Sequence, residues 1–327
     1  MATYKGIQGF SIQNLSADPS NLIEGQVWYN STSNVWKVEE LTTAGAWATG
    51  GNLGTARGYL AGAGTQIAGL AFGGYTGTVY TGATEEYDGS TWTAGGSLGT
   101  GRRYLGNAGT QTAALGFGGR SPPSPPSNAT EEYDGSTWSP GGNMGTARYG
   151  LAGCGTQTAG LGFNGFDGTS RTVVTEEYDG STWSPGGNMA TARNSLAGCG
   201  TQTAGLGFGG YLGGFSYSNS TEEYNGSTWT AGGTLNTARG FLGAAGTQTA
   251  SLAFGGGPGF SQTGATEEYD GSSWTTSPAS LSTARFALAG AGIQTAGLAF
   301  GGANPVRSDT EEWLGAGAAV TKTITVS

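Results

Sequence analysis

The chain has 327 residues, a length that allows one large domain or two small ones. Glycine supplies 66 residues without a strict third-residue spacing, which excludes collagen, and the 11% aromatic content is too high for a disordered chain. The net charge of −9 disfavours nucleic-acid binding, and the absence of histidine removes the usual general base and metal ligand. We therefore expect an all-β protein with no cofactor, no metal and no nucleic-acid partner.

The chain also carries no membrane or export signal that its sequence reveals. No apolar run reaches the length needed to cross a bilayer, and residues 1–10 lack the charged-then-apolar pattern of a signal peptide. We expect no membrane insertion and synthesis without Sec export.

The first 46 residues stand apart from the rest of the sequence. Within them, Ala17 to Val38 predicts a hairpin of two aromatic strands around a Ser/Thr/Asn turn. The stretch Glu-Gly-x-x-Trp-Tyr-Asn-Ser-Thr (Glu24 to Thr32) resembles an element that recurs in structural proteins of tailed bacteriophages. The resemblance implies a virion protein, such as a tail fibre, tail appendage or capsid-surface protein, assembled in the host cytoplasm. It also implies attachment to other virion proteins through residues 1–46, and a homo-oligomer in the virion.

Six repeats occupy residues 47–315. Each contains a Thr-Ala-Arg signature, with Gly101 in place of Ala in the second copy, and successive arginines are 45 or 46 residues apart. These arginines are Arg57, Arg102, Arg148, Arg193, Arg239 and Arg285. We expect each to be structural and fixed by carboxylate or carbonyl acceptors at the junctions between blades, because a semi-buried guanidinium without acceptors is costly.

Each repeat predicts four short strands, which is the content of one propeller blade. Gln157 to Phe163 is apolar or tiny on both faces, as in a strand between two sheets, and should lie near the hub. The Asp-Gly pair, which becomes Asn225-Gly226 once, is typical of a tight hairpin turn. The fold predicted for residues 47–315 is a six-bladed β-propeller.

The order of motifs is similar to the kelch repeat: Gly-Gly after an apolar strand, Glu-x-Tyr-Asp, Thr-Trp, then Ala-Arg. The last repeat departs from it, because Trp313 replaces Tyr and the Asp-Gly-Ser-Thr-Trp turn is missing. Trp47 to Asn52 matches the missing strand, so we expect N-terminal sequence to close the ring. Residues 316–327 predict an edge strand or a contact with a partner subunit.

Acidic pairs and two cysteines also recur at fixed repeat positions. The acidic pairs begin at Glu85, Glu131, Glu176, Glu222, Glu267 and Glu311. We expect one Glu of each pair to contact a repeat arginine and the other to be solvated, because adjacent strand residues point to opposite faces. Cys154 and Cys199 replace alanine, so we expect buried free thiols.

The loops after the Gly-Gly pairs differ in every repeat, and by topology they lie on one face of the ring. They carry aromatic residues that are candidates for binding a host-surface glycan or another protein: Tyr75, Tyr80, Phe166, Tyr211, Phe215, Tyr217 and Phe260. Capping of the apolar ends of the blades remains an alternative role.

Three classes of function are open. The leading one is a non-enzymatic virion structural protein whose propeller is an interaction or receptor-binding module. The alternative is a glycan-active enzyme, such as a sialidase, but the Asp-box positions are occupied by Tyr87 and Glu85. Galactose oxidase, also kelch-type, requires histidine ligands for its copper, and this chain has no histidine. A cellular kelch adaptor is disfavoured by the N-terminal segment.

Overall fold

The computed structural model describes residues 13–19, 26–41, 44–121, 123, 125–259, 261–316 and 319–324. The chain divides into two compact units, which we call the terminal unit (Met1–Gly45 with Gly315–Ser327) and the ring unit (Ala46–Leu314). All regular structure in the described residues is β-strand. No helix in this part of the chain is long and apolar enough to cross a membrane.

The ring unit contains six four-stranded antiparallel sheets, one for each repeat. The first strands are β5 (Ala61–Thr65), β9 (Gly106–Gly109), β13 (Ala152–Thr156), β17 (Ala197–Thr201), β23 (Gly243–Gly246) and β27 (Ala289–Ile293). The second strands are β6 (Ala68–Phe72), β10 (Ala114–Phe117), β14 (Ala159–Phe163), β18 (Ala204–Phe208), β24 (Ser251–Phe254) and β28 (Ala296–Phe300). The third strands are β7 (Thr84–Tyr87), β11 (Thr130–Tyr133), β15 (Thr175–Tyr178), β21 (Thr221–Tyr224), β25 (Ala265–Tyr269) and β29 (Thr310–Leu314). The fourth strands are β8 (Trp92–Gly95), β12 (Trp138–Pro140), β16 (Trp183–Pro185), β22 (Trp229–Ala231), β26 (Trp274–Ser280) and, in the last sheet, β4 (Ala46–Thr49).

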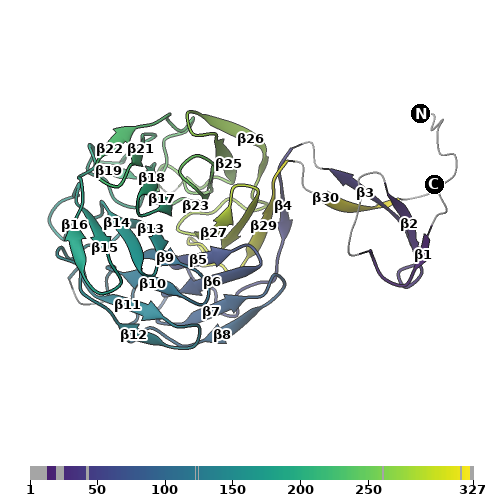
Figure 1. The fold of residues 1–327 in the computed structure, drawn as a ribbon, viewed down its shortest axis with the longest axis horizontal. Helices are drawn as coiled ribbons and strands as arrows, with labels where there is room; N and C mark the ends of the chain where they lie inside the picture. The colour runs from purple at the N-terminus through teal and green to yellow at the C-terminus, as the bar shows by residue number, and fades with distance from the viewer. Residues whose placement is uncertain are drawn as a thin grey trace. The chain divides into compact units, whose positions relative to one another are not determined.

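The first strands contact one another in chain order, from β5 to β27, and β27 contacts β5 again (Figure 1). This arrangement is consistent with a β-propeller. At the entrance to each first strand, one residue with φ between 54° and 63° donates its backbone N–H to the carbonyl of its counterpart in the preceding repeat. These residues are Tyr59, Tyr104, Gly150, Ser195, Phe241 and Ala287. The cycle is complete, because the Tyr59 N–H donates to the Ala287 carbonyl at 2.8 Å.

The last sheet is completed by the N-terminal strand β4, which pairs antiparallel with β29 so that Trp47 lies opposite Trp313. This pairing confirms the expectation that residues near Trp47 replace the strand missing from the sixth repeat. Because β4 and β29 come from opposite ends of the ring unit, their pairing joins the first and last parts of its chain.

Neighbouring sheets are held together by the same contacts at all six junctions. The Trp138 ring packs on Phe72 of the preceding sheet with centroids 4.8 Å apart, and its indole N–H donates to Thr84 at 2.9 Å. The Gln111 amide donates to the Gly69 and Tyr87 carbonyls of that sheet, at 3.0 and 2.7 Å. The same tryptophan-to-threonine bonds start at Trp47, Trp92, Trp183, Trp229 and Trp274.

The terminal unit contains a separate four-stranded sheet, in the order β1 (Gln13–Leu15), β2 (Val27–Asn30), β3 (Val35–Leu41) and β30 (Ala319–Ile324). The predicted aromatic hairpin is confirmed by the antiparallel pairing of β2 with β3. Strand β30 pairs with β3, so the chain end adds an edge strand to this sheet. The Asp18 carboxylate accepts hydrogen bonds from Lys37, Asn30 and Trp28, which lower its pKa to about 2.

Candidate functional site: the loop face of the ring unit

Six buried ion pairs hold the repeat arginines. The Arg148 guanidinium lies 2.9 Å from the Glu176 carboxylate and also donates to the Asn164 and Val174 carbonyls. The other pairs are Arg57–Glu85, Arg102–Glu131, Arg193–Glu222, Arg239–Glu267 and Arg285–Glu311. Every acceptor comes from the arginine's own repeat, so the bond network ties the start of each repeat to its second and third strands. The expectation that these acceptors lie at the junctions between sheets was therefore wrong.

The second glutamate of the acidic pair is not simply solvated, and that expectation was wrong. At five junctions it accepts a hydrogen bond from a tyrosine hydroxyl of the next sheet, as in Tyr133 to Glu86 and Tyr224 to Glu177. These tyrosines are fully buried, so the bond satisfies a hydroxyl that would otherwise be orphaned. The carboxylates that recur in every repeat therefore contribute mainly to the framework.

The residues that differ among repeats are concentrated at one end of the ring axis. In an antiparallel four-stranded sheet, the loop between strands 2 and 3 and the link to the next sheet leave from the same edge. We call this side the loop face; the short turns between strands 1 and 2 and between strands 3 and 4 form the turn face. The loop face includes the loops after the Gly-Gly pairs and the two residues that follow each repeat arginine.

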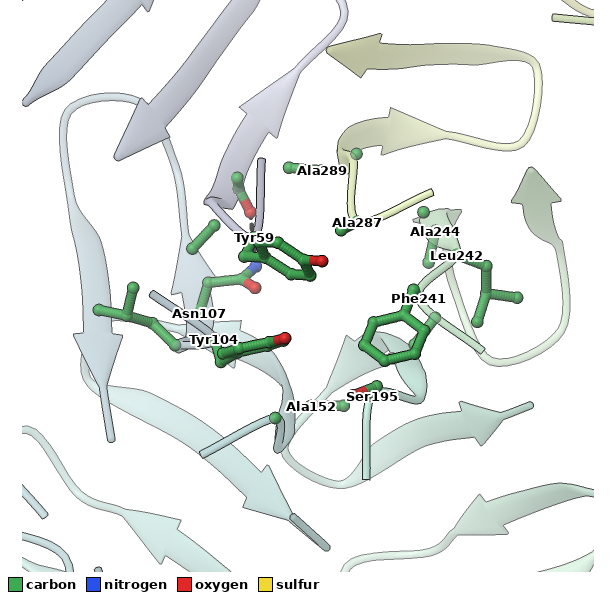
Figure 2. A pocket seen from close by; sticks show the side chains of 18 of the residues that line it. Tyr59, Tyr104, Asn107, Ala152, Ser195, Phe241, Leu242, Ala244, Ala287 and Ala289 are labelled. Atoms are coloured by element: carbon green, nitrogen blue, oxygen red, sulfur yellow. Dashed lines mark hydrogen bonds between the residues drawn. The ribbon is translucent and has the colours of Figure 1, made fainter. Parts of the chain in front are cut away.

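A cavity of about 120 Å³ opens on the axis at the loop face. Figure 2 shows the rings of Tyr59 and Tyr104 on one side of it and the ring of Phe241 on the other. Asn107 contributes the amide in its wall, and that amide donates to the Gly62 carbonyl of the neighbouring first strand. Burial raises the pKa of Tyr104 well above its usual range.

The rim of this cavity is asymmetric although the backbone around it is repeated. The six positive-φ positions carry two tyrosines, a phenylalanine and three small residues. A positive φ costs a non-glycine residue on the order of 1–3 kcal/mol, and the closed cycle of hydrogen bonds holds these residues in place. A uniform framework thus presents different side chains around one opening.

Arginine and tyrosine side chains extend from the rim over the first two repeats. The Arg103 guanidinium carbon lies 4.5 Å from the centre of the Tyr80 ring, and 4.9 to 5.3 Å from the centres of the Tyr104, Tyr59 and Tyr75 rings. These distances are those of cation–π contacts. The five side chains make a continuous layer from the cavity to the first variable loop.

The structure groups most of the aromatic residues proposed from the sequence into two clusters. Tyr75 and Tyr80 meet edge to face, with ring centres 5.4 Å apart. Tyr211 packs on Tyr217 at 5.2 Å and, through Arg171, lies next to Phe166. These five side chains are half-buried, so they both support the loops and leave surface for a ligand.

The two remaining candidates are different. Phe215 is 84% exposed at the tip of the hairpin formed by β19 (Tyr211–Gly213) and β20 (Ser216–Tyr217). Phe260 lies outside the described residues.

Sequence reasoning missed two groups of residues on the loop face. They are the arginines Arg103, Arg120 and Arg171, and the axial aromatic residues Tyr59, Tyr104 and Phe241. The two positions after each repeat arginine read Gly-Tyr, Arg-Tyr, Tyr-Gly, Asn-Ser, Gly-Phe and Phe-Ala. This variation, immediately after an invariant residue, was the available signal. Its position at the axis follows from the cycle of hydrogen bonds between repeats, which no single repeat reveals.

The loop face and the turn face have opposite charge. Besides the six buried arginines, the arginines of the ring unit are Arg103, Arg120, Arg171 and Arg307, all on the loop face. The loop face carries two acidic residues, and both are engaged: Asp167 caps its own turn, and Asp309 pairs with Arg307 at 2.7 Å. The turn face carries Asp88, Asp134, Asp179 and Asp270. Anionic ligands are therefore favoured at the loop face.

The turn-face end of the axis holds a second cavity, of about 100 Å³, lined by glycine, alanine, Asn107 and the two cysteines. Cys154 and Cys199 are buried free thiols, as expected from the sequence. Burial raises the pKa of Cys199 to about 12, so the reactive thiolate is suppressed. The described residues contain no cluster of three or more potential metal ligands.

No protein-family model matches the chain, and a search of curated proteins finds no significant relative.

Proposed function

We propose that the ring unit is a six-bladed kelch-type β-propeller that acts as a non-catalytic binding module, with the loop face as its binding surface. One observation carries this proposal: the recurring polar residues are used in contacts within and between sheets, whereas the variable residues surround a cavity at one end of the axis. Such a division separates a framework from a recognition surface.

The terminal unit is proposed as the attachment segment. Its aromatic hairpin carries the Trp28-Tyr29-Asn30 stretch that resembles bacteriophage structural proteins, and the hairpin is a folded part of a sheet of its own. We therefore propose a virion structural protein, held to other virion proteins through this unit, whose loop face engages a host-surface glycan or a neighbouring virion protein.

A glycan-active enzyme is the less favoured function. Hydrolysis of a glycosidic bond generally uses a pair of carboxylates that flank the bond. On the described part of the loop face, Asp167 lies in a turn where it accepts two backbone hydrogen bonds, and Asp309 is paired with Arg307. These engagements favour binding over catalysis.

The test compares the two faces. The first variant replaces Tyr211, Phe215 and Tyr217 of the loop face by Ser. The second variant carries Ile67→Ser and Ile293→Ser on the turn face, where these two side chains are 69% and 53% exposed. The loop-face variant should lose host adsorption or virion assembly while it still melts cooperatively as a folded protein, and the turn-face variant should retain both activities. Equal behaviour of the two variants would reject the proposal. Immunogold labelling of purified virions should locate the chain on the particle.

A further inference from the structure

Arg103 and Arg120 form a pair of like charges on the loop face. Each donates its backbone N–H to the carbonyl of the other, at 3.1 and 3.0 Å. In such an antiparallel pair the two Cα atoms are about 5.5 Å apart and both side chains leave the same side of the ladder. Like charges placed directly opposite each other are destabilising.

Neither guanidinium has an acceptor in the described part of the chain. No carboxylate there pairs with either side chain, and the Nε–H of each is buried without a hydrogen-bond partner. Both side chains are half-buried. A guanidinium offers five N–H donors in a planar fork that suits carboxylate or sulfate oxygens. The pair thus has the charge and the donors for an anion.

This pair occurs in one repeat of the six. The equivalent positions in the other repeats are Gly58 with Tyr75, Tyr149 with Phe166, Asn194 with Tyr211, Gly240 with Gly257, and Phe286 with Ala303. A contact needed for the framework would recur, as the Arg–Glu pairs do. The arginine pair is instead a local addition to one side of the axial cavity.

Tyrosines surround both arginines. Arg103 lies against four rings, and Arg120 lies 5.3 Å from the centre of the Tyr149 ring, which packs on Tyr104 at 5.7 Å. Tyrosine rings stack on the C–H faces of sugars, and their hydroxyls exchange hydrogen bonds with sugar hydroxyls. Tyrosines around two cations on neighbouring backbone positions match a saccharide that carries an acidic group.

We infer that Arg103 and Arg120 bind the carboxylate or sulfate of an acidic saccharide, whose sugar rings pack on the surrounding tyrosines and extend toward the axial cavity. This inference rests on the proposed binding function of the loop face. An extended nucleic acid is a poorer match, because the chain has a net charge of −9 and the loop-face cations are few. An acidic peptide is the competing ligand, and the experiment includes it.

Calorimetric titration of the full chain tests the inference with five probes: trigalacturonate, sialyllactose, sulfated lactose, neutral lactose and an oligo-aspartate peptide. At least one acidic saccharide should bind, and bind more tightly than lactose and the peptide. The sulfated and carboxylated probes distinguish the two sources of the anion. Absence of binding by all three acidic saccharides, or tighter binding of lactose or the peptide, would overturn the inference.

Three variants assign the binding to this pair. The double variant Arg103→Gln with Arg120→Gln should weaken binding of the acidic saccharide by about tenfold or more, since it removes the charge-assisted hydrogen bonds. Arg120→Gln alone should weaken binding less than the double variant does. It disturbs fewer packing contacts, because Arg120 lies against one ring and Arg103 against four. Arg307→Gln, which removes one charge from the same face at a residue that pairs with Asp309 and lies outside the aromatic clusters, should leave affinity within about twofold. Equal losses in all variants would contradict the assignment.

This experiment is separable from the test of the proposed function. If the Tyr211, Phe215 and Tyr217 variant loses adsorption while no acidic saccharide binds, the inference fails and the loop-face function stands. If that variant adsorbs and assembles normally, the function itself fails.

Discussion

The hydroxyl of Tyr269 donates a hydrogen bond to Glu223 of the preceding sheet at 2.5 Å. Burial, together with this carboxylate, raises the pKa of Tyr269 to about 12 from 10.0. The folded state thus keeps a proton that the unfolded chain loses at lower pH, so the contribution to stability is intact below about pH 10 and is lost between about pH 10 and 12. Tyr87, Tyr178 and Tyr224 have the same shift.

Tyr269→Phe should lower the free energy of unfolding at neutral pH by about 1.5–3 kcal/mol, the range for a hydrogen bond to a charged group. Its loss of stability above pH 10 should also be shallower than that of the unmodified chain. Urea denaturation at several pH values measures both effects. Tyr211→Phe is the control, because the Tyr211 hydroxyl makes no hydrogen bond to the described residues; an equal loss in the control would contradict the account.

The junction between the fifth and sixth sheets differs from the others in two related features, a missing turn on one side and a proline on the other. A Cβ on Gly233 would lie 2.1 Å from the Ser272 carbonyl oxygen in the turn of the next sheet. The sixth repeat lacks that turn, and in the fifth repeat Pro278 follows Trp274 by the same four residues by which Gly233 follows Trp229. The proline is thus accommodated only at the junction where the turn is missing.

Gly233→Ala should therefore destabilise the ring by about 1–3 kcal/mol, the usual cost of overpacking. Pro278→Ala should change stability by less than about 1 kcal/mol, because no turn opposes it. Thermal melting compares the two variants, and a well-tolerated Gly233→Ala would refute this explanation of Gly233.

The buried ion pair Arg193–Glu222, 3.0 Å apart, gives a third prediction. Arg193→Met leaves a carboxylate buried without its partner and should cost about 3–5 kcal/mol. Adding Glu222→Gln should recover part of the loss. Ligand binding at the loop face should survive in both variants below their melting temperatures; binding lost without a change in melting would show that Arg193 is not structural.

Cys154 and Cys199 should resist thiol reagents in the folded protein, since both are buried and the pKa of each is raised by burial. Reaction with an aromatic disulfide reagent should require denaturant and then yield two thiols per chain. Rapid reaction under native conditions would contradict the burial of these side chains.

The sequence predicted local features better than contacts between repeats. The spacing of the repeat arginines and the Asp-Gly turns indicated four short strands in each repeat, and four-stranded antiparallel sheets are what form. The match of Trp47 to other repeats indicated its pairing with the last sheet.

Contacts between neighbouring sheets, and between links and loops, could not be predicted in this way. The Tyr133–Glu86 bond joins two sheets, and the Arg103–Arg120 pair depends on the register between a link and a loop. Neither register is encoded by alternation of side chains within one strand, so the second glutamates were expected to be solvated and the arginine pair was missed.

Site-directed photo-crosslinking shows which face of the ring unit is the binding face. A benzophenone amino acid replaces Phe215 on the loop face or Ile67 on the turn face, and both positions are well exposed. Virions carrying each variant are irradiated after mixing with host envelopes. If the loop face is the binding face, we expect crosslinks to an envelope component or to a neighbouring virion protein from position 215 and none from position 67. Crosslinks from position 67 alone would contradict it.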